Sequence, residues 1–249
     1  FVMPSIIMMV FTSIYGVVDG LFISNFVGST AFAAINLVMP FPMVLGGVGF
    51  MVGTGGTALV AKTLGEGKRD LANRYFTMMV YFTLILGITL GVLGIIFIRP
   101  VSYLLGADEE MIEYCVVYGS IVIGFTVAFM LQNLFQNFLV VAEKPKLGLI
   151  ATVAAGCTNM ALDALFIGGF RWGVVGAALA TGISQLVGGI LPLIYFLRPN
   201  NSLLRLVPTR LEGKPLVRAV TNGSSELMNN ISSSLVSVVY NLQLLAYFG

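Results

Sequence analysis

The stretch SIYGVVDGLFISNFVG, residues 13–28, decides the fold because it places the carboxylate of Asp19 inside an apolar segment that begins at the first residue. A helix that crosses a bilayer needs roughly 20 predominantly apolar residues. A charge at the bilayer centre costs on the order of 3 kcal/mol. The stretch therefore predicts a membrane helix whose aspartate faces the interior of a helix bundle or a water-filled cavity.

The composition of the whole chain indicates an integral membrane protein. Of its 249 residues, 57% are hydrophobic and 10% are charged, against about 25% charged residues in soluble domains. The chain has no histidine, which excludes histidine bases, metal ligands and haem ligands. Its two cysteines suggest no disulfide framework. A net charge of +2 gives no reason to expect nucleic acid, and the missing basic region before the first apolar run predicts no cleavable signal peptide.

Apolar runs long enough to span a membrane occur seven times. We expect helices rather than strands, because the runs are continuous and do not alternate. The expected spans are residues 2–26, 33–60, 75–98, 112–140, 147–169, 173–197 and 216–248. The second span contains Pro40, Pro42 and many glycines, for which we expect tight helix packing.

The basic residues predict the orientation of these helices. All 13 Lys and Arg residues except Arg99 and Arg171 fall in the loops after the second, fourth and sixth spans, with Arg218 just inside the start of the seventh span. Loops rich in Lys and Arg stay in the cytoplasm. We therefore expect a multi-pass protein of the plasma membrane with a cytoplasmic N-terminus.

The last expected span resembles the first. A shift of 221 positions pairs Ser13 with Ser234, Val17 with Val238, Val18 with Val239, Leu21 with Leu242 and Gly28 with Gly249. Because six spans separate the two starts, both repeats would have the same orientation, as in parallel transporter repeats. We therefore expect an all-α membrane protein. Residues 1–197 would form a six-helix transmembrane bundle, and residues 198–215 would form a cytoplasmic loop. Residues 216–249 would form the first helix of an incomplete second repeat.

Acidic residues inside the expected spans are the strongest functional signal, and they are Asp19, Asp163 and Glu226. Tyr15 precedes Asp19 by one helical turn and Asn159 precedes Asp163 by one turn, so each pair shares a helix face. Thr181 lies on the following helix. Two carboxylates with amide and hydroxyl oxygens suit a hard cation such as Na⁺, or a proton. The alternative is that these groups only hydrogen-bond between helices.

A polar stripe on the fourth span forms a second candidate site. Its members, each one turn from another, are Gln132, Asn133, Gln136 and Asn137. The stripe predicts the wall of a cavity for a drug-sized amphipathic solute, and interhelical hydrogen bonding is the alternative.

Four stretches resemble the multidrug and toxic compound extrusion (MATE) transporters. They are VVDGLFISNFVGSTAFAAINLVMPF, AKTLGEGKRDLANRYF, NMALDALFIGGFRWGVVGAALATGISQ and GSSELMNNISSS, and together they extend over most of the chain. The resemblance implies twelve helices in two six-helix lobes around a central cavity. It also implies export of organic, often cationic, compounds in exchange for protons or sodium ions. This chain would then be the N-terminal lobe plus the seventh helix, and it would lack the C-terminal lobe.

The resemblance also implies roles for individual residues. It assigns Asp19, Asn159 and Asp163 to a cation site in the N-terminal lobe, with Tyr15 and Thr181 beside it. It assigns Pro4 to a bend of the first helix that follows protonation, and Glu226 to a site that involves the second lobe. The coupling ion would be Na⁺ or H⁺, with no other cofactor, and the partners would be the lipid bilayer and small organic cations.

Alternating access is the mechanism that these residues favour over three alternatives. A lipid-linked oligosaccharide flippase would need basic cavity residues, whereas Lys and Arg lie in loops here. An intramembrane aspartyl protease would need two aspartates that share a proton, and Asp163 lies in ALDAL without a GxGD context. A half-protein that folds but moves nothing alone is the third alternative. We expect a transporter and not an enzyme.

Overall fold

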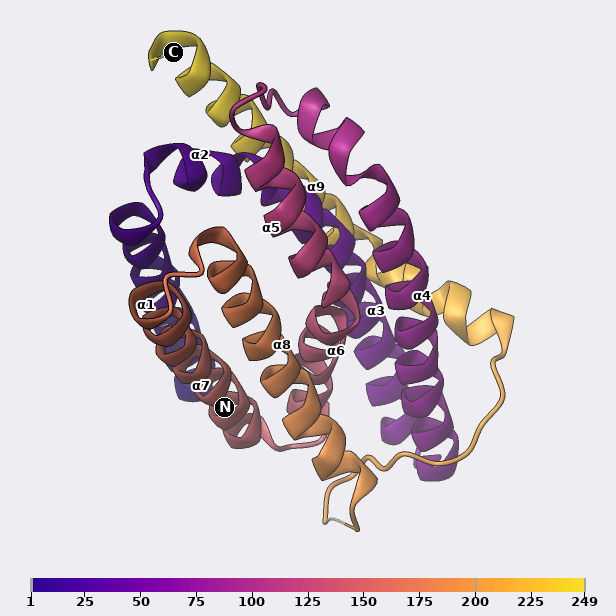
Figure 1. Ribbon diagram of the computed structural model, residues 1–249. Helices are drawn as coiled ribbons and strands as arrows, with labels where there is room; N and C mark the ends of the chain where they lie inside the picture. The colour runs from indigo at the N-terminus through magenta and orange to yellow at the C-terminus, as the bar shows by residue number, and fades with distance from the viewer. Residues whose placement is uncertain (1, 200, 249) are drawn as a thin grey trace.

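The structure, a computed structural model, describes residues 2–199 and 201–248, without the side chains of residues 2, 4, 5, 9, 15 and 244–248. The described residues form helices and no strand (Figure 1). In chain order the helices are α1 (Val2–Phe26), α2 (Ser29–Val38), α3 (Pro40–Gly65), α4 (Arg69–Leu104), α5 (Ile112–Gly124), α6 (Thr126–Val141), α7 (Pro145–Asp163), the π-helix η1 (Ala164–Gly169), α8 (Gly173–Leu197) and α9 (Gly213–Phe248). The all-α prediction is confirmed.

The six spans expected before residue 198 each correspond to helices that are long and apolar enough to cross a membrane. The second span begins earlier than expected and consists of α2 and α3, with Pro40 as the first residue of α3. Proline suits this position because the first residue of a helix has no intrahelical partner for an N–H. The fourth span consists of α5 and α6, which meet at Phe125 with a bend of 53°.

The seventh expected span is present as a helix, but it is more polar than the others. α9 begins at Gly213 and has 36 residues. It is absent from the described helices that are apolar enough to qualify as membrane spans. The reason lies in its first half, which carries the polar residues Asn222, Ser224, Ser225, Glu226, Asn229 and Asn230. A helix of this composition requires polar or protein surroundings on part of its surface.

Glycines bring α3 into close contact with its neighbours. A Cβ atom on Gly55 would lie 1.8 Å from the carbonyl oxygen of Ala219, and one on Gly223 would lie 1.9 Å from that of Met51. A Cβ atom on Gly49 would lie 2.6 Å from the Met130 backbone of α6. These approaches exclude any side chain. The glycine-rich span is therefore a packing surface for α9 and α6, as predicted.

One end of the bundle carries three connections (Figure 1), and these connections together with the helix turns beside them hold most of the Lys and Arg residues. These connections follow α3, α6 and α8. The Arg69 guanidinium donates hydrogen bonds to the carbonyl oxygens of Ser202, at 2.8 Å, and Leu203, at 3.2 Å. The Arg205 N–H donates to Asn73 Oδ1 at 2.9 Å. These bonds fasten the long α8–α9 connection to the first turns of α4. We call this end of the molecule the basic end, after its Lys and Arg residues.

Exposed ion pairs occur at both ends of the bundle. At the basic end, Lys68 Nζ lies 2.8 Å from Glu66 Oε2. The hydrogen bond to Lys68 lowers the pKa of Glu66, and the same bond raises the pKa of Lys68. At the opposite end, the turn before α5 holds Asp108, Glu109 and Glu110, and Arg99 pairs there with Glu113.

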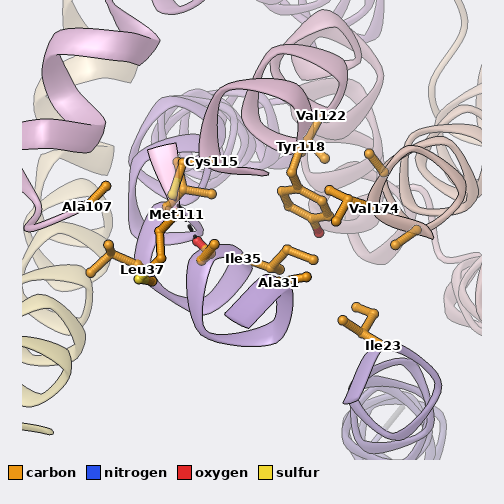
Figure 2. Close-up of a cluster of buried hydrophobic side chains, with 14 of the residues drawn as sticks. Ile23, Ala31, Ile35, Leu37, Ala107, Met111, Cys115, Tyr118, Val122 and Val174 are labelled. Carbon is orange, nitrogen blue, oxygen red and sulfur yellow. Dashed lines mark hydrogen bonds between the residues drawn. The ribbon is translucent and has the colours of Figure 1, made fainter. Parts of the chain in front are cut away.

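Two groups of buried apolar side chains hold the helices together. The first lies toward the end opposite the basic end and includes Ile23 of α1, Ile35 of α2, Tyr118 of α5 and Val174 of α8 (Figure 2). The second lies nearer the basic end, where the rings of Phe76, Phe135, Phe138 and Phe196 of α4, α6 and α8 contact one another, mostly edge-on or tilted. These two groups hold α1, α7 and α8 in the positions that form the site.

Candidate cation and solute site

Asp19 and Asp163 lie against each other at the contact between α1 and α7. Their carboxyl groups are within hydrogen-bonding reach of each other. Asp163 is completely buried, whereas Asp19 is half-buried. Asp19 Oδ1 and both Asp163 oxygens receive no hydrogen bond from a donor in the described residues. Two such carboxyl groups form a stable pair only when a proton or a cation lies between them.

A fourth unsatisfied oxygen belongs to Asn159, one turn before Asp163 on α7. Its side chain is 3% exposed, and Oδ1 has no hydrogen-bond partner in the described part of the chain. Buried polar oxygens are normally satisfied, because an unsatisfied one costs about 1–3 kcal/mol. The cluster thus offers several oxygens that lack donors, which is what a proton or a hard cation requires.

The α7 helix changes form immediately after Asp163. Residues Ala164–Gly169 make up the π-helix η1, and Asp163 is the last α-helical residue before it. π-helical turns inside α-helices occur frequently at functional sites. The wider turn follows directly after the carboxylate of the cluster.

Tyr118 of α5 is a member of the cluster that the sequence analysis missed. Its ring is fully buried, and its hydroxyl lies within hydrogen-bonding reach of Thr181 on α8 and near both carboxyl groups. It also lies 3.9 Å from the Met39 sulfur. Figure 2 shows the ring extending from α5 into the apolar group, with the hydroxyl end toward Ile23 of α1. This buried hydroxyl therefore lies within reach of Thr181 and within electrostatic range of the acidic pair.

A cavity of about 500 Å³ opens beside the acidic pair. Asp19, Asn159 and Thr181 line it, and Asp163 does not. Asp19 is the one charged side chain among the described residues of its wall. Large apolar side chains form much of the rest and include Phe32, Met39, Met43, Phe50 and Phe129. This volume and lining suit a drug-sized solute with an apolar body and one positive charge.

The polar stripe of α6 divides between this cavity and a helix contact. Gln132, Asn133 and Gln136 line the cavity. Gln132 Oε1 and Asn133 Nδ2 lack partners in the described chain, whereas Gln136 Nε2 donates to Thr152 Oγ1 at 3.1 Å. Asn137 lies outside the cavity wall, next to Gly53 of α3, and its amide donates to the Asn133 carbonyl oxygen at 3.0 Å. Asn137 therefore makes a helix contact.

Three further predicted residues lie away from the cavity wall or outside the described side chains. Glu226 is half-buried on α9 and does not line the cavity, and its backbone carbonyl accepts a hydrogen bond from Asn230 Nδ2 at 2.9 Å. Tyr15 and Pro4 belong to α1, but their side chains are outside the part of the structure that is described.

The donor set of the cluster consists of oxygens, which suit a hard cation or a proton. The described residues contain no group of three or more histidine, cysteine or acidic side chains arranged to hold a metal. Two carboxylates with the Asn159 amide and Thr181 hydroxyl oxygens provide hard ligands. Asp19, Asn159, Asp163 and Thr181 are the residues that would hold Na⁺, and the acidic pair alone would hold a proton.

The comparison with known protein families identifies the family of this chain. The MatE family model matches residues 4–165, which extend from α1 to the residues just after Asp163. The chain belongs to the MatE family. The sequence resemblance to the MATE transporters is thereby confirmed, as is the fold expected from it.

MATE relatives match along the whole chain. The multidrug export protein MepA of Staphylococcus saprophyticus is 30% identical over 253 residues, covering 99% of this chain and 55% of the relative. MepA of Staphylococcus aureus strain MRSA252 is 24% identical over 250 residues, covering 100% of this chain and 55% of the relative. The chain therefore spans about half the length of the curated relatives it matches.

Solved MATE structures have the same fold. An inward-facing multidrug resistance MATE transporter superposes with a TM-score of 0.84 at 22% identity, over 90% of this chain and 51% of that chain. An outward-facing structure gives a TM-score of 0.87 at 22% identity, over 94% of this chain and 52% of that chain. The similar scores indicate that the likeness concerns the fold of one lobe and not one transport state.

Proposed function

We propose that this chain forms the cation-coupled half of a MATE exporter that expels organic cations in exchange for H⁺ or Na⁺ by alternating access. The supporting observation is the contact between Asp19 and Asp163 at the wall of a drug-sized cavity. The names of the MepA relatives, which describe multidrug export, agree with the proposal. It describes a transporter rather than an enzyme.

The organic solute and the coupling ion would compete for Asp19, and this competition would couple solute export to the entry of H⁺ or Na⁺. Asp19 lines the cavity and contacts Asp163, so it belongs to both the solute site and the cation site. An ionised Asp19 attracts a cationic solute inside a low-dielectric wall. A proton or Na⁺ that enters the acidic pair neutralises the same carboxylate. The solute then loses its counter-charge and is released.

The coupling ion changes the conformational equilibrium only if it binds one state better than the other. α1 is the element that would respond, because it carries Asp19, packs against α7 and lines the cavity. We propose that occupation of the acidic pair draws α1 toward α7, with the bend at Pro4 that the family resemblance implies. The missing C-terminal lobe would complete the cavity wall.

The distribution of Lys and Arg supports an orientation with the basic end in the cytoplasm. The N-terminus would then be cytoplasmic, and the acidic turn with Asp108, Glu109 and Glu110 would face outward. The exposed apolar side chains along α1 and α4 would contact the acyl chains of the plasma membrane.

A flippase for lipid-linked oligosaccharides is not supported by the cavity. Among the described residues of its wall there is no Lys or Arg to bind a pyrophosphate group. Protease chemistry is not supported by the local sequence, because Asp163 lacks the GxGD context.

Vesicle transport of a fluorescent organic cation by the complete protein tests the proposal. The protein would be reconstituted and its efflux driven by a proton gradient or by a sodium gradient, each alone. We expect one gradient to drive efflux, and the variant Asp19→Asn to lose gradient-driven efflux. The exposed acid Glu109 supplies the matched control, Glu109→Gln, which should transport normally. Unchanged gradient-driven efflux by Asp19→Asn would falsify the proposed coupling.

A further inference from the structure

A second pocket of about 500 Å³ lies at the basic end of the bundle, away from the cavity that contains Asp19. Its walls come from the residue that precedes α7 and from the last two turns of α8 with the connection that follows it. The polar residues that line it are Lys144, Tyr195, Arg198 and Asn201. None of these residues lines the Asp19 cavity or belongs to the acidic cluster.

Two cations from distant parts of the chain meet in this pocket, and its described lining contains no carboxylate. Lys144 is half-buried and caps the start of α7, so the positive end of the helix dipole lies beside it. Arg198 is the residue that follows the last turn of α8. Two cations, a helix N-terminus, an amide and a phenol are the chemistry that recognises a phosphate group.

The same pocket has an apolar side that belongs to a membrane span. Leu191 and Ile194 of α8 line it and are 39% and 40% exposed. They belong to the last two turns of a helix that is long and apolar enough to cross a bilayer. An apolar strip of this kind continues from the cationic pocket along the helix toward the bilayer core. A free inorganic anion would use only the polar half of this arrangement.

We propose that this pocket binds an anionic phospholipid, with its phosphate between Lys144 and Arg198 and its acyl chains along Leu191 and Ile194. Basic pockets between membrane helices near the cytoplasmic surface are suited to acidic lipid headgroups. The occupant is a lipid and not a soluble phosphate because the pocket joins its cations to a lipid-exposed apolar strip. The inference concerns binding alone and is independent of the transport mechanism.

Native mass spectrometry of the complete protein in detergent tests the proposal by counting retained lipids. The probes are dioleoylphosphatidylglycerol, dioleoylphosphatidylcholine and inorganic phosphate. We expect the wild type to retain phosphatidylglycerol in preference to phosphatidylcholine, and the variant Lys144→Gln/Arg198→Gln to bind phosphatidylglycerol roughly 10- to 30-fold more weakly. The matched control Lys146→Gln/Arg210→Gln removes two exposed cations of the basic end that lie outside the pocket, and it should bind as the wild type does.

A second variant separates a lipid from a soluble anion. Leu191→Asn/Ile194→Asn keeps both cations, so it should weaken phosphatidylglycerol binding several-fold and leave phosphate binding unchanged. Thermal unfolding of each lipid-free variant checks that the fold is intact, and the single variants Lys144→Gln and Arg198→Gln replace the double variant if it unfolds. Equal phosphatidylglycerol binding by the pocket and control variants would overturn the proposal. The proposal would also be overturned if inorganic phosphate displaced the lipid from the wild type and Leu191→Asn/Ile194→Asn had no effect on phosphatidylglycerol binding.

Discussion

At the scale of single residues, the acidic pair is asymmetric. Asp19 is half-buried and lines the cavity, whereas Asp163 is completely buried and does not. A solute in the cavity can therefore reach one carboxylate directly, while a small cation can reach both. Loss of the Asp19 charge should therefore affect both solute binding and ion coupling, whereas loss of the Asp163 charge should affect ion coupling alone.

The two asparagine variants should accordingly separate solute affinity from ion coupling. Asp19→Asn removes the one charge of the described cavity wall, so we expect binding of a fluorescent organic cation to weaken by about 10-fold or more. Asp163→Asn should change solute binding by less than about 3-fold, while gradient-driven efflux is lost in both variants. Dye binding to the detergent-solubilised protein, combined with vesicle efflux, measures the two effects. Equal loss of dye affinity in both variants would contradict the asymmetry.

Tyr118 and Thr181 should act together in ion binding. The Tyr118 hydroxyl is fully buried near both carboxyl groups and within reach of Thr181. Tyr118→Phe removes a buried hydrogen bond, so we expect about 1 kcal/mol lower stability and a several-fold weaker response to the coupling ion. Because Tyr118 does not line the cavity, solute affinity should stay unchanged.

A double-mutant cycle supplies the decisive measurement for this pair. The effects of Tyr118→Phe and Thr181→Val on the ion concentration that gives half-maximal efflux should not add in the double variant. The exposed tyrosine Tyr103 provides the matched control, Tyr103→Phe, with no expected effect. Additive single effects would show that the two hydroxyl groups act separately.

At the scale of elements, the contact between α3 and α9 is the tightest approach involving the last helix. The backbones of Gly55 and Ala219 meet, as do those of Gly223 and Met51. Small residues permit such contacts and let helices associate without large apolar side chains. α9 is thus held on the bundle despite its polar first half.

One added methyl group at this contact should destabilise the fold. Gly55→Ala would place a Cβ atom against the Ala219 carbonyl oxygen, and a backbone atom cannot yield as a flexible side chain does. We expect about 1–3 kcal/mol lower stability, seen as a lower unfolding temperature in detergent. The control is Gly65→Ala at the last residue of α3, where no atom lies within 4 Å of the new Cβ. A fall of the same size in both variants would contradict the packing argument.

Sequence periodicity predicts which residues share one face of a helix. It does not predict which residues of different helices come together when the helices pack. Asp19, Asn159 and Asp163 are visible in the sequence because polar groups in apolar spans are costly, and the one-turn spacing of the α7 pair puts both on one face. Tyr118 gives no such signal, since tyrosine is ordinary in an apolar span and only the approach of α1 and α8 places its hydroxyl. The spacing also grouped Asn137 with Gln136, although the two residues face different neighbours in the bundle.

At the scale of the whole molecule, the two ends differ in charge. The connections after α3, α6 and α8 and the helix turns beside them carry most of the Lys and Arg residues. Hydrogen bonds from Arg69 and Arg205 hold the longest of these connections against α4. The opposite end presents an acidic turn before α5. This asymmetry is the basis for the proposed orientation, which would place the proposed phospholipid pocket in the inner leaflet.

Cysteine labelling in intact cells should reveal opposite accessibility for the two ends. The background would carry Cys115→Ala and Cys157→Ser, which removes the buried and the exposed native thiol. A membrane-impermeant maleimide should label Glu110→Cys in intact cells, because this exposed residue lies in the acidic turn. Arg74→Cys and Arg210→Cys, exposed at the basic end, should react only after permeabilisation. Labelling of the basic-end cysteines in intact cells would show that the proposed orientation is wrong. The lipid pocket would then lie in the outer leaflet, and Asp19 would exchange its cation in the opposite direction.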